Sequence, residues 1–262
     1  MIQKIKHYLY KNVFRLLKYE FETFIPNSAG RKKTINKLIK ININNSILNL
    51  ALISDRFQEI EVSHFKELKI DKSFQDNLNK LFSLYGSDKN KHGYDKLYSY
   101  IFSMISLTPK ILEIGMGSVN SNIPSNMGKR GVPGASLRAF ADLFPDSQIY
   151  GADIDKDILF QENNISTFYL DQNQLSTYDN PIIENKKFDL IIDDGVHMQS
   201  ANLNSLLFSL ERLTNNGVLV VEDVPFSALD TWKIVINLIR KPFSIRIIKC
   251  IDNYAITLSK DS

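Results

Sequence analysis

Between about residues 73 and 258, short apolar runs alternate with stretches in which apolar residues recur at helical spacing. Short runs rich in Ile, Val and Leu and bounded by Gly, Asp or Asn are typical of buried strands, whereas apolar positions three or four residues apart are typical of helices. The predicted strands are 110–115, 148–153, 166–170, 188–193, 217–222, 243–250 and 253–258. The predicted helices are 73–84, 94–106, 134–143, 200–213 and 226–239. A loop rich in Gly, Asn, Ser and Pro is predicted at 117–133.

Strands that alternate with helices predict an α/β fold with a doubly wound parallel sheet. The last two predicted strands are separated only by a short turn at Asp252 and Asn253, so we expect them to pair as an antiparallel hairpin. The expected sheet therefore has seven strands. Ligands of such sheets bind outside the carboxyl ends of the strands, so functional side chains are expected there.

Residues 1–72 lack this alternation, and we assign them to a mainly helical N-terminal extension ahead of a domain at 73–262. The first 40 residues hold ten Lys or Arg and two Glu, about +8 of charge, so the rest of the chain carries about −5 of the total of +3. Apolar residues and lysines alternate at roughly helical spacing over 1–19. This segment is interpreted as a helix docked on the domain or on a second subunit, or as a basic amphipathic helix in weak contact with an anionic membrane surface.

The composition is that of an ordinary globular protein, with 44% hydrophobic and 23% charged residues. A net charge of +3 gives no broad electrostatic footprint for nucleic acid. Cys250 is the single cysteine, so neither an internal disulfide nor a cysteine-ligated zinc site is expected. Since no apolar run reaches membrane-spanning length and no signal-peptide core is found, we expect a cytoplasmic protein, peripheral to the inner membrane under the second interpretation of 1–19.

The first predicted strand ends in a glycine loop, Glu113-Ile114-Gly115-Met116-Gly117. Gly115 and Gly117 let the backbone turn sharply and let a ligand approach without a Cβ clash. A lone Gly-x-Gly is also a common structural turn, and Asn at position 120 removes the third glycine of the dinucleotide-binding pattern. An acidic residue inside the strand, here Glu113, is typical of methyltransferases that use S-adenosylmethionine (SAM).

Acidic residues also end the second and third predicted strands. Asp153 can accept two hydrogen bonds from a ribose diol, whereas Asp155 is expected to cap the next helix. At Asp171 and Gln172, the carboxylate can accept a hydrogen bond from an adenine amino group. Together with the glycine loop, these strand ends predict SAM as the cofactor.

The fourth and fifth predicted strands end in Asp-Asp-Gly-Val-His at 193–197 and in Glu-Asp at 222–223. Because the carboxyl ends of neighbouring parallel strands lie side by side, we expect Asp194, Glu222 and Asp223 to converge on one divalent cation. Carboxylate oxygens favour Mg²⁺, with Mn²⁺ or Ca²⁺ as alternatives, over zinc. Each motif alone is a common turn or helix cap, but their joint placement beside a cofactor loop favours a metal site.

An aliphatic hydroxyl is almost wholly protonated at neutral pH, so its methylation needs activation. A divalent cation makes a bound hydroxyl more acidic and orients it, which gives its ligand Asp194 a catalytic role. His197 lies three residues after Asp194, and imidazole is the side chain that titrates near neutral pH, so we assign His197 as the general base. Asp193 is expected to orient the loop or the cofactor through its hydrogen bonds.

The motifs together resemble those of metal-dependent sugar O-methyltransferases of the mycinamicin and macrocin type and of their relatives from bacterial polysaccharide loci, which are class I methyltransferases. The resemblance runs from about 78 to 258 and rests above all on Asp-Asp-Gly-x-His with Glu-Asp. The other matching segments are Tyr85-Gly86-Ser87-Asp88-Lys89, His92-Gly93-Tyr94, 112–115, 133–138, 150–155 and 171–172. It implies a Rossmann-like class I fold, SAM as cofactor, Mg²⁺ bound by Asp194, Glu222 and Asp223, and His197 as base. It also implies that four residues lie near the methionyl end of SAM: Tyr85, Ser87, Lys89 and Ser136.

The loop at 117–133 is longer than in the macrolide enzymes, and the first 70 residues have no counterpart that aligns. We therefore expect the acceptor to be a sugar hydroxyl of a nucleotide sugar, or of a glycan of a bacterial capsule or surface polysaccharide, rather than a macrolide. A small phenolic or natural-product acceptor is the alternative, and a catalytically inactive partner subunit is the non-enzyme alternative. The resemblance also implies homo-oligomers formed through N-terminal elements.

Overall fold

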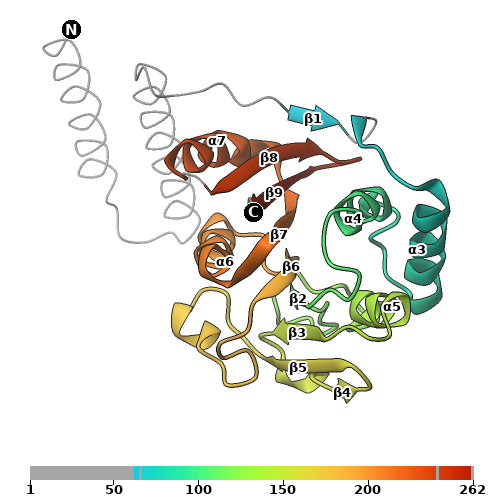
Figure 1. Cartoon of the computed structure of the whole chain (residues 1–262). Coiled ribbons are helices and arrows are strands. Elements are labelled where there is room, and N and C mark those ends of the chain that lie inside the picture. Colours follow the sequence, from blue (N-terminus) through green and yellow to red (C-terminus); the bar gives the residue numbers. More distant parts are fainter. Residues whose placement is uncertain (1–61, 65–66, 240–241, 261–262) are drawn as a thin grey trace, which may run out of the picture. The chain divides into compact units, whose positions relative to one another are not determined.

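A computed structural model describes residues 62–64, 67–239 and 242–260, and its strands form one sheet in the order β1-β8-β9-β7-β6-β2-β3-β5-β4 (Figure 1). The strands are β1 (Val62–His64), β2 (Ile111–Ile114), β3 (Ile149–Asp153), β4 (Gln161–Glu162), β5 (Ile165–Tyr169), β6 (Phe188–Asp193), β7 (Leu213–Val224), β8 (Phe243–Lys249) and β9 (Tyr254–Lys260). The α-helices are α3 (Lys72–Tyr85), α4 (Tyr94–Phe102), α5 (Ala135–Leu143), α6 (Gln199–Arg212) and α7 (Leu229–Leu238). Short 3₁₀ turns are η2 (Lys156–Ile158), η3 (Leu175–Tyr178) and η4 (Phe226–Ala228).

The predicted doubly wound α/β class is confirmed, and the predicted hairpin is present because β9 runs antiparallel to both β7 and β8. The strand number differs from the seven expected, since β1 and β4 add short strands at the two edges of the described sheet. They span only three and two residues, which is too short to leave a periodic pattern in the sequence. Residues 62–64 fall within the predicted N-terminal extension, but they pair in parallel with β8.

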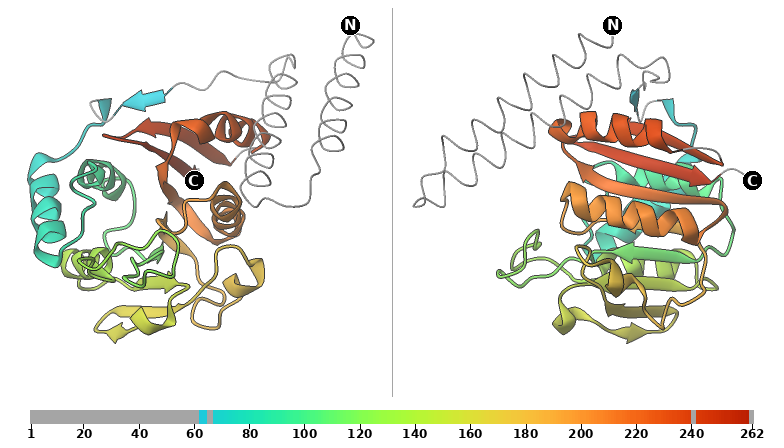
Figure 2. Two further views of the ribbon diagram at one scale, coloured as in Figure 1. Left: turned by 180° about the vertical axis from the view of Figure 1, so that it is seen from behind. Right: turned by 90° about the vertical axis from the view of Figure 1, so that its left-hand side faces the viewer.

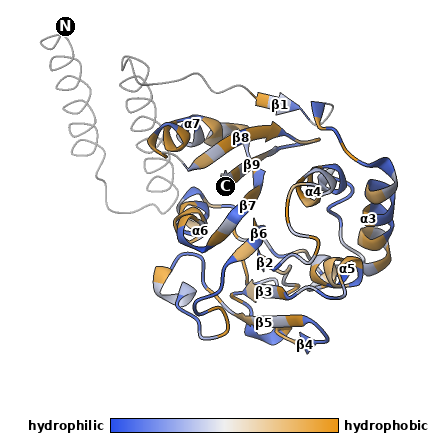
Figure 3. Cartoon of the chain, viewed as in Figure 1, coloured by the Kyte–Doolittle hydropathy of each residue, from blue (hydrophilic) through white to orange (hydrophobic). Residues whose placement is uncertain are grey.

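Helices cover both faces of the sheet: α3, α4 and α5 lie on one face, and α6 and α7 lie on the other (Figures 1 and 2). Each helix layer packs on the sheet through its own cluster of buried apolar side chains. Figure 3 shows hydrophobic and hydrophilic stretches side by side along these helices, as expected for helices that bury one face. Central strands such as β2 and β6 are mostly apolar and almost wholly buried because both of their faces are covered.

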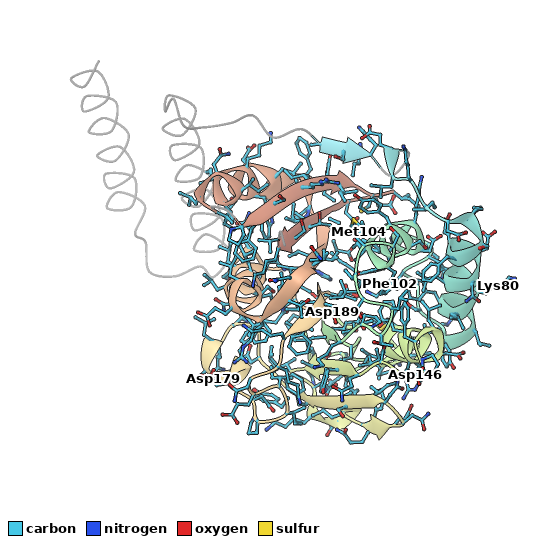
Figure 4. The ribbon with its side chains drawn as sticks, viewed as in Figure 1. Lys80, Phe102, Met104, Asp146, Asp179 and Asp189 are labelled. Atoms are coloured by element: carbon cyan, nitrogen blue, oxygen red, sulfur yellow. The ribbon has the colours of Figure 1, made fainter. Side chains whose placement is uncertain are left out.

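The α3–α5 layer is held together by aromatic packing. Phe102, labelled in Figure 4, lies at the end of α4 with its ring centroid 5.7 Å from that of Phe140 and 4.8 Å from that of Phe144. The chain turns after Phe102, so α4 is shorter than the predicted helix at 94–106. At the start of α3, the side chain of Asp71 accepts hydrogen bonds from the backbone N–H groups of Ser73 and Phe74, which satisfies free amides of the first turn.

The predicted loop at 117–133 has no helix or strand and projects beyond the carboxyl ends of the strands, in green at the left of the right-hand view of Figure 2. That edge of the sheet therefore carries both the glycine loop and the acidic strand ends. The expectations for 1–19, of docking on a subunit or on a membrane surface, lie outside the described residues. Within the part of the chain that the structure describes, none of the helices has the length and apolar character needed to cross a bilayer.

Candidate active site

A cavity of about 230 Å³ opens at the carboxyl ends of β2, β3, β5, β6 and β7. Its walls come from the glycine loop after β2, from the loop at 117–133 and from the residues that follow the other strands. Most of the predicted site residues share this one cavity. They are Ser87, Lys89, Glu113, Gly115, Gly117, Ser136, Asp153, Asp171, Gln172, Asp194, His197 and Asp223.

Three predicted site residues do not line the cavity. The hydroxyl of Tyr85 donates to Asp142 of α5 at 3.3 Å. Asp193 is fully buried and accepts hydrogen bonds from the side chains of Gln172 at 2.6 Å and Asn202 at 3.0 Å. Asp193 thus orients Gln172, which lines the cavity, but does not line the cavity itself. The third residue, Glu222, is buried and accepts a hydrogen bond from Tyr98 of α4.

Gly115 brings two loops into backbone contact. Its φ is +93°, in the left-handed region, and a Cβ there would lie 2.3 Å from the carbonyl oxygen of Asp194. The N–H of Asp194 in turn donates to the carbonyl of Ile114 at 2.9 Å. Only glycine fits this position. The contact and the hydrogen bond together fix the glycine loop against the loop that carries Asp194 and His197.

The second strand end ties its carboxylate to the glycine loop. Asp153 accepts a hydrogen bond from the N–H of Met116 at 2.7 Å and from the N–H of Asp155 at 2.9 Å. Burial raises the pKa of Asp153, and these backbone donors oppose that rise. Asp155 caps η2 by accepting from the N–H of Asp157, as predicted. Asp153 therefore shapes the loop and contributes the cavity wall.

Lys89 lies at the centre of a buried group of carboxylates. Its ammonium Nζ is 2.7 Å from Asp194 Oδ2, 2.7 Å from Glu222 Oε2 and 3.1 Å from Glu113 Oε1. An ammonium has three N–H donors, so these three carboxylates use all of them. Lys89 is 3% exposed, Glu113 1% and Glu222 2%, so the contacts with the two glutamates are shielded from water, whereas the Asp194 side chain is 28% exposed.

The remaining oxygens of the two buried carboxylates are also occupied. Ser136 donates to Glu113 Oε2 at 2.5 Å, and the hydroxyl of Tyr98 donates to Glu222 Oε1. Burial raises the pKa of both glutamates, although Lys89 opposes the rise. Burial also acts to lower the pKa of Lys89, but the surrounding carboxylates hold it well above its usual range. Three carboxylates thus face one ammonium, and the group favours additional positive charge.

A second set of ligand atoms faces the cavity. His197 Nε2 lies 4.0 Å from Asp194 Oδ1 and 3.9 Å from Asp223 Oδ2, and one ligand atom from each of the three residues lies within 4.8 Å of the others. Both His197 and Asp223 have positive φ, near +52° and +54°. Non-glycine residues adopt that conformation at a cost, and such strain clusters at functional sites.

An irregularity in β7 separates Glu222 from Asp223. The pairing of β7 with β9 shifts register between Val221 and Val224, which is a β-bulge at the two acidic residues. Bulges redirect side chains at strand ends. Here the bulge leaves Glu222 beside Lys89 and presents Asp223 Oδ2 to the cavity.

The residues that hold Glu222 and Asp223 include three that were not among the predicted site residues. Tyr94 donates its hydroxyl to Asp223 Oδ1 at 2.9 Å and accepts from the N–H of Asp223 at the same distance. Asn253 donates to Asp223 Oδ1, and Tyr98 donates to Glu222. In a sequence, Tyr98 is indistinguishable from a core aromatic of an amphipathic helix, and Asn253 from a turn residue. Tyr94 stands out only as part of the matching His-Gly-Tyr segment.

The chain is similar in sequence to curated methyltransferases. No family model matches the chain. It is 26% identical over 151 residues to the 8-demethyl-8-(2-methoxy-alpha-L-rhamnosyl)-tetracenomycin-C 3'-O-methyltransferase of Streptomyces olivaceus, which covers 56% of this chain and 37% of the relative. It is 32% identical over 115 residues to the mycinamicin VI 2''-O-methyltransferase of Micromonospora griseorubida, which covers 44% of this chain and 27% of the relative. The chain thus spans well under half the length of these curated relatives.

Among solved structures, the chain is similar to the MycE methyltransferase of the mycinamycin biosynthetic pathway in complex with Mg and SAH. The TM-score is 0.56 at 23% identity, with 71% of this chain and 55% of that chain covered. The fold is that of a class I methyltransferase. The resemblance to sugar O-methyltransferases predicted from the motifs is confirmed as sequence similarity.

Replacing Gly115 by Ala tests the loop contact in this class I fold. The positive φ alone costs about 1–2 kcal/mol for an alanine, and the clash with the Asp194 carbonyl adds to it, so we expect a loss of about 3 kcal/mol or more in the free energy of unfolding. Gly128→Ala is the matched control, because Gly128 also has a positive φ but nothing lies within 4 Å of the position that a Cβ would take there. Urea titrations of both variants measure the difference, and equal losses would contradict the close contact.

Proposed function

We propose that this chain is an O-methyltransferase that uses SAM and Mg²⁺ to methylate a sugar hydroxyl. The observation that carries the proposal is a single cavity lined both by the glycine loop and by Asp194, His197 and Asp223. The relatives support the acceptor class, since their names describe methylation of hydroxyls on sugar-bearing compounds.

The cavity has the features that a SAM site needs. Gly115 and Gly117 line it without side chains of their own, and Asp153 and Asp171 are also among its lining residues. Carboxylates at these strand ends suit the ribose hydroxyls and the adenine amino group of the cofactor. The MycE structure that shares the fold holds SAH and Mg.

The donor set also fits a divalent cation. Asp194 Oδ1 and Asp223 Oδ2 face the cavity near His197, and carboxylate oxygens are ligands that Mg²⁺ or Mn²⁺ prefers. We propose Asp194 and Asp223 as the cavity-facing ligands. Glu222, the third expected ligand, does not line the cavity, and each of its oxygens accepts a hydrogen bond, one from Lys89 and one from Tyr98.

The side chains of the chain then divide the chemistry between them. When bound, SAM supplies an electrophilic methyl group, and a divalent cation makes a coordinated hydroxyl more acidic. His197 takes the proton of the acceptor hydroxyl at Nε2, and its two neighbouring carboxylates stabilise the imidazolium that results. The acceptor oxygen forms the new bond to the methyl carbon as the carbon–sulfur bond breaks, which leaves SAH and the methyl ether.

An exposed aromatic ring follows the acidic pair of β7 along the chain. Phe226 follows Asp223 by three residues and is 76% exposed, with its ring centroid 6.3 Å from that of Tyr254. Tyr254 adjoins Asn253, which donates to Asp223. An aromatic face beside hydrogen-bonding groups suits a sugar ring, which has apolar C–H faces and hydroxyls at its edge. We propose a nucleotide sugar or a glycan of a bacterial surface polysaccharide as the acceptor, with a small phenol as the alternative.

Cofactor and metal use are tested together. We expect SAM or SAH to raise the melting temperature of the full chain, and expect turnover of a sugar acceptor to stop in EDTA and return with Mg²⁺. SAH formation measured against a panel of nucleotide sugars, surface glycans and catechols identifies the acceptor. Full activity in EDTA would remove the metal role, activity confined to catechols would replace the sugar, and no thermal response at millimolar SAM would remove the function.

Replacing His197 by Ala tests the base. We expect kcat to fall by roughly 10²–10⁴ because the acceptor proton loses its acceptor. The rise in melting temperature with SAH should persist, since the glycine loop is untouched. His64→Ala, on the exposed edge strand β1, is the control and should keep wild-type turnover. Wild-type kcat in His197→Ala would assign the proton to another group.

Replacing Phe226 by Ala tests the acceptor surface. We expect the KM for the sugar acceptor to rise about tenfold, equivalent to about 1.4 kcal/mol of lost stacking and burial, with the KM for SAM unchanged. Leu238→Ala removes a similarly exposed apolar side chain, at the far end of α7, and serves as the control. An unchanged acceptor KM in Phe226→Ala would exclude this ring from the acceptor site.

A further inference from the structure

Lys89 contacts three carboxylates that come from three different strand ends. Glu113 belongs to β2, Asp194 follows β6, and Glu222 belongs to β7, while Lys89 itself lies in the connection between α3 and α4. All three N–H donors of the ammonium are used within the group. The ammonium of Lys89 is therefore engaged by carboxylates of the chain itself.

The contacts with Lys89 decide which oxygens face the cavity. Asp194 accepts a hydrogen bond from Lys89 at Oδ2, and its Oδ1 lies on the side of His197. Glu222 accepts a hydrogen bond from Lys89 at Oε2 and one from Tyr98 at Oε1, so both of its oxygens have a partner within the chain. We call Glu113, Glu222 and Asp194 Oδ2, which contact Lys89, the inner group. We call Asp194 Oδ1 and Asp223 Oδ2, which lie near His197 and are open to a cation, the outer pair.

Buried carboxylates are costly without a counter-charge, and removing one partner of a buried ion pair destabilises a protein strongly. Glu113 and Glu222 are almost wholly buried, and Lys89 is the cation in contact with both of them. The inner group therefore depends on Lys89 whenever no other positive charge is present.

We propose that Lys89 is a positioning residue of the cation site: its ammonium is a resident counter-ion that holds Glu222 and Asp194 in place before a divalent cation binds, and it weakens the affinity for that cation. The proposal rests on the proposed function in that it takes the outer pair to be the Mg²⁺ site. Its consequence is specific, because a chain without Lys89 should become dependent on divalent cations for its stability.

The test compares four forms of the full chain by thermal unfolding in EDTA and in Mg²⁺, and by calorimetric titration with Mn²⁺. They are the wild type, Lys89→Met, the double variant Lys89→Met with Glu222→Gln, and Lys72→Met. Met keeps the length of the lysine side chain without its charge. Lys72→Met is the control for loss of an ion pair, since Lys72 lies 2.9 Å from Asp76 on the exposed face of α3.

In EDTA, we expect Lys89→Met to melt about 10 °C below the wild type, and expect the double variant to recover much of that loss because a buried negative charge is removed with the positive one. Mg²⁺ should raise the melting temperature of Lys89→Met more than that of the wild type. Mn²⁺ should bind Lys89→Met about tenfold more tightly or better, since a neighbouring positive charge is gone, and bind the double variant near the wild-type affinity. Lys72→Met should match the wild type throughout.

A purely structural lysine would lower the melting temperature without changing the response to cations, so equal Mg²⁺ shifts in Lys89→Met and the wild type would overturn the proposal. If Lys89→Met does not fold, the double variant decides. A double variant that shows no cooperative unfolding transition would also overturn the proposal, and a folded double variant with wild-type Mn²⁺ affinity supports it. The EDTA measurements contain no ligand, and the response of the wild type to SAH is recorded separately. Failure of the methyltransferase function is therefore distinguishable from failure of the role of Lys89.

Discussion

Negative charge gathered at one edge of a parallel sheet is the constraint on which the rest of this structure depends. The register pairs Ile114 at the end of β2 with Asp193 of β6, and Asp193 with Val221 of β7. Glu113, Asp194 and Glu222 therefore each lie one residue from the same level of the sheet. Two of them, Glu113 and Glu222, are buried and accept hydrogen bonds from the α3–α5 layer. Such a cluster is tolerable only when hydrogen bonds and a cation compensate it, and Lys89, Ser136 and Tyr98 do so.

The same constraint explains why helices that never contact the cavity matter to it. Tyr94 and Tyr98 lie one helical turn apart on α4, and each places a hydroxyl on one of the adjacent residues Asp223 and Glu222. Their rings belong to the aromatic packing between the helices and the sheet. The orientation of Glu222 and Asp223 therefore depends on the core of the α3–α5 layer, and close packing of that core holds the two side chains in place.

The sequence predicted the strands that build the site well, because long apolar runs bounded by Gly and Asp leave a clear pattern. The predicted strand at 188–193 has the same bounds as β6. The pattern does not predict the edge strands β1 and β4, because they are too short to be periodic. The strand ends were sufficient to bring Asp194, His197 and Asp223 to one cavity. The partners of Lys89 were beyond reach, since a lysine in a loop gives no sign of which of many carboxylates it will contact.

Glu222 shows where a motif stops being informative. Successive side chains of a regular strand point to opposite faces, so two adjacent acids cannot both face one ligand unless the backbone departs from regular geometry. The departure is present as the bulge and the positive φ of Asp223, but it turns Asp223 toward the cavity while Glu222 stays with Lys89. A Glu-Asp pair at a strand end therefore specifies two environments, one that carries the internal counter-ion and one that is open to a ligand. The position of the bulge along the strand decides which residue takes which environment. That position depends on the pairing of β7 with β9, and no local pattern in the sequence encodes this pairing.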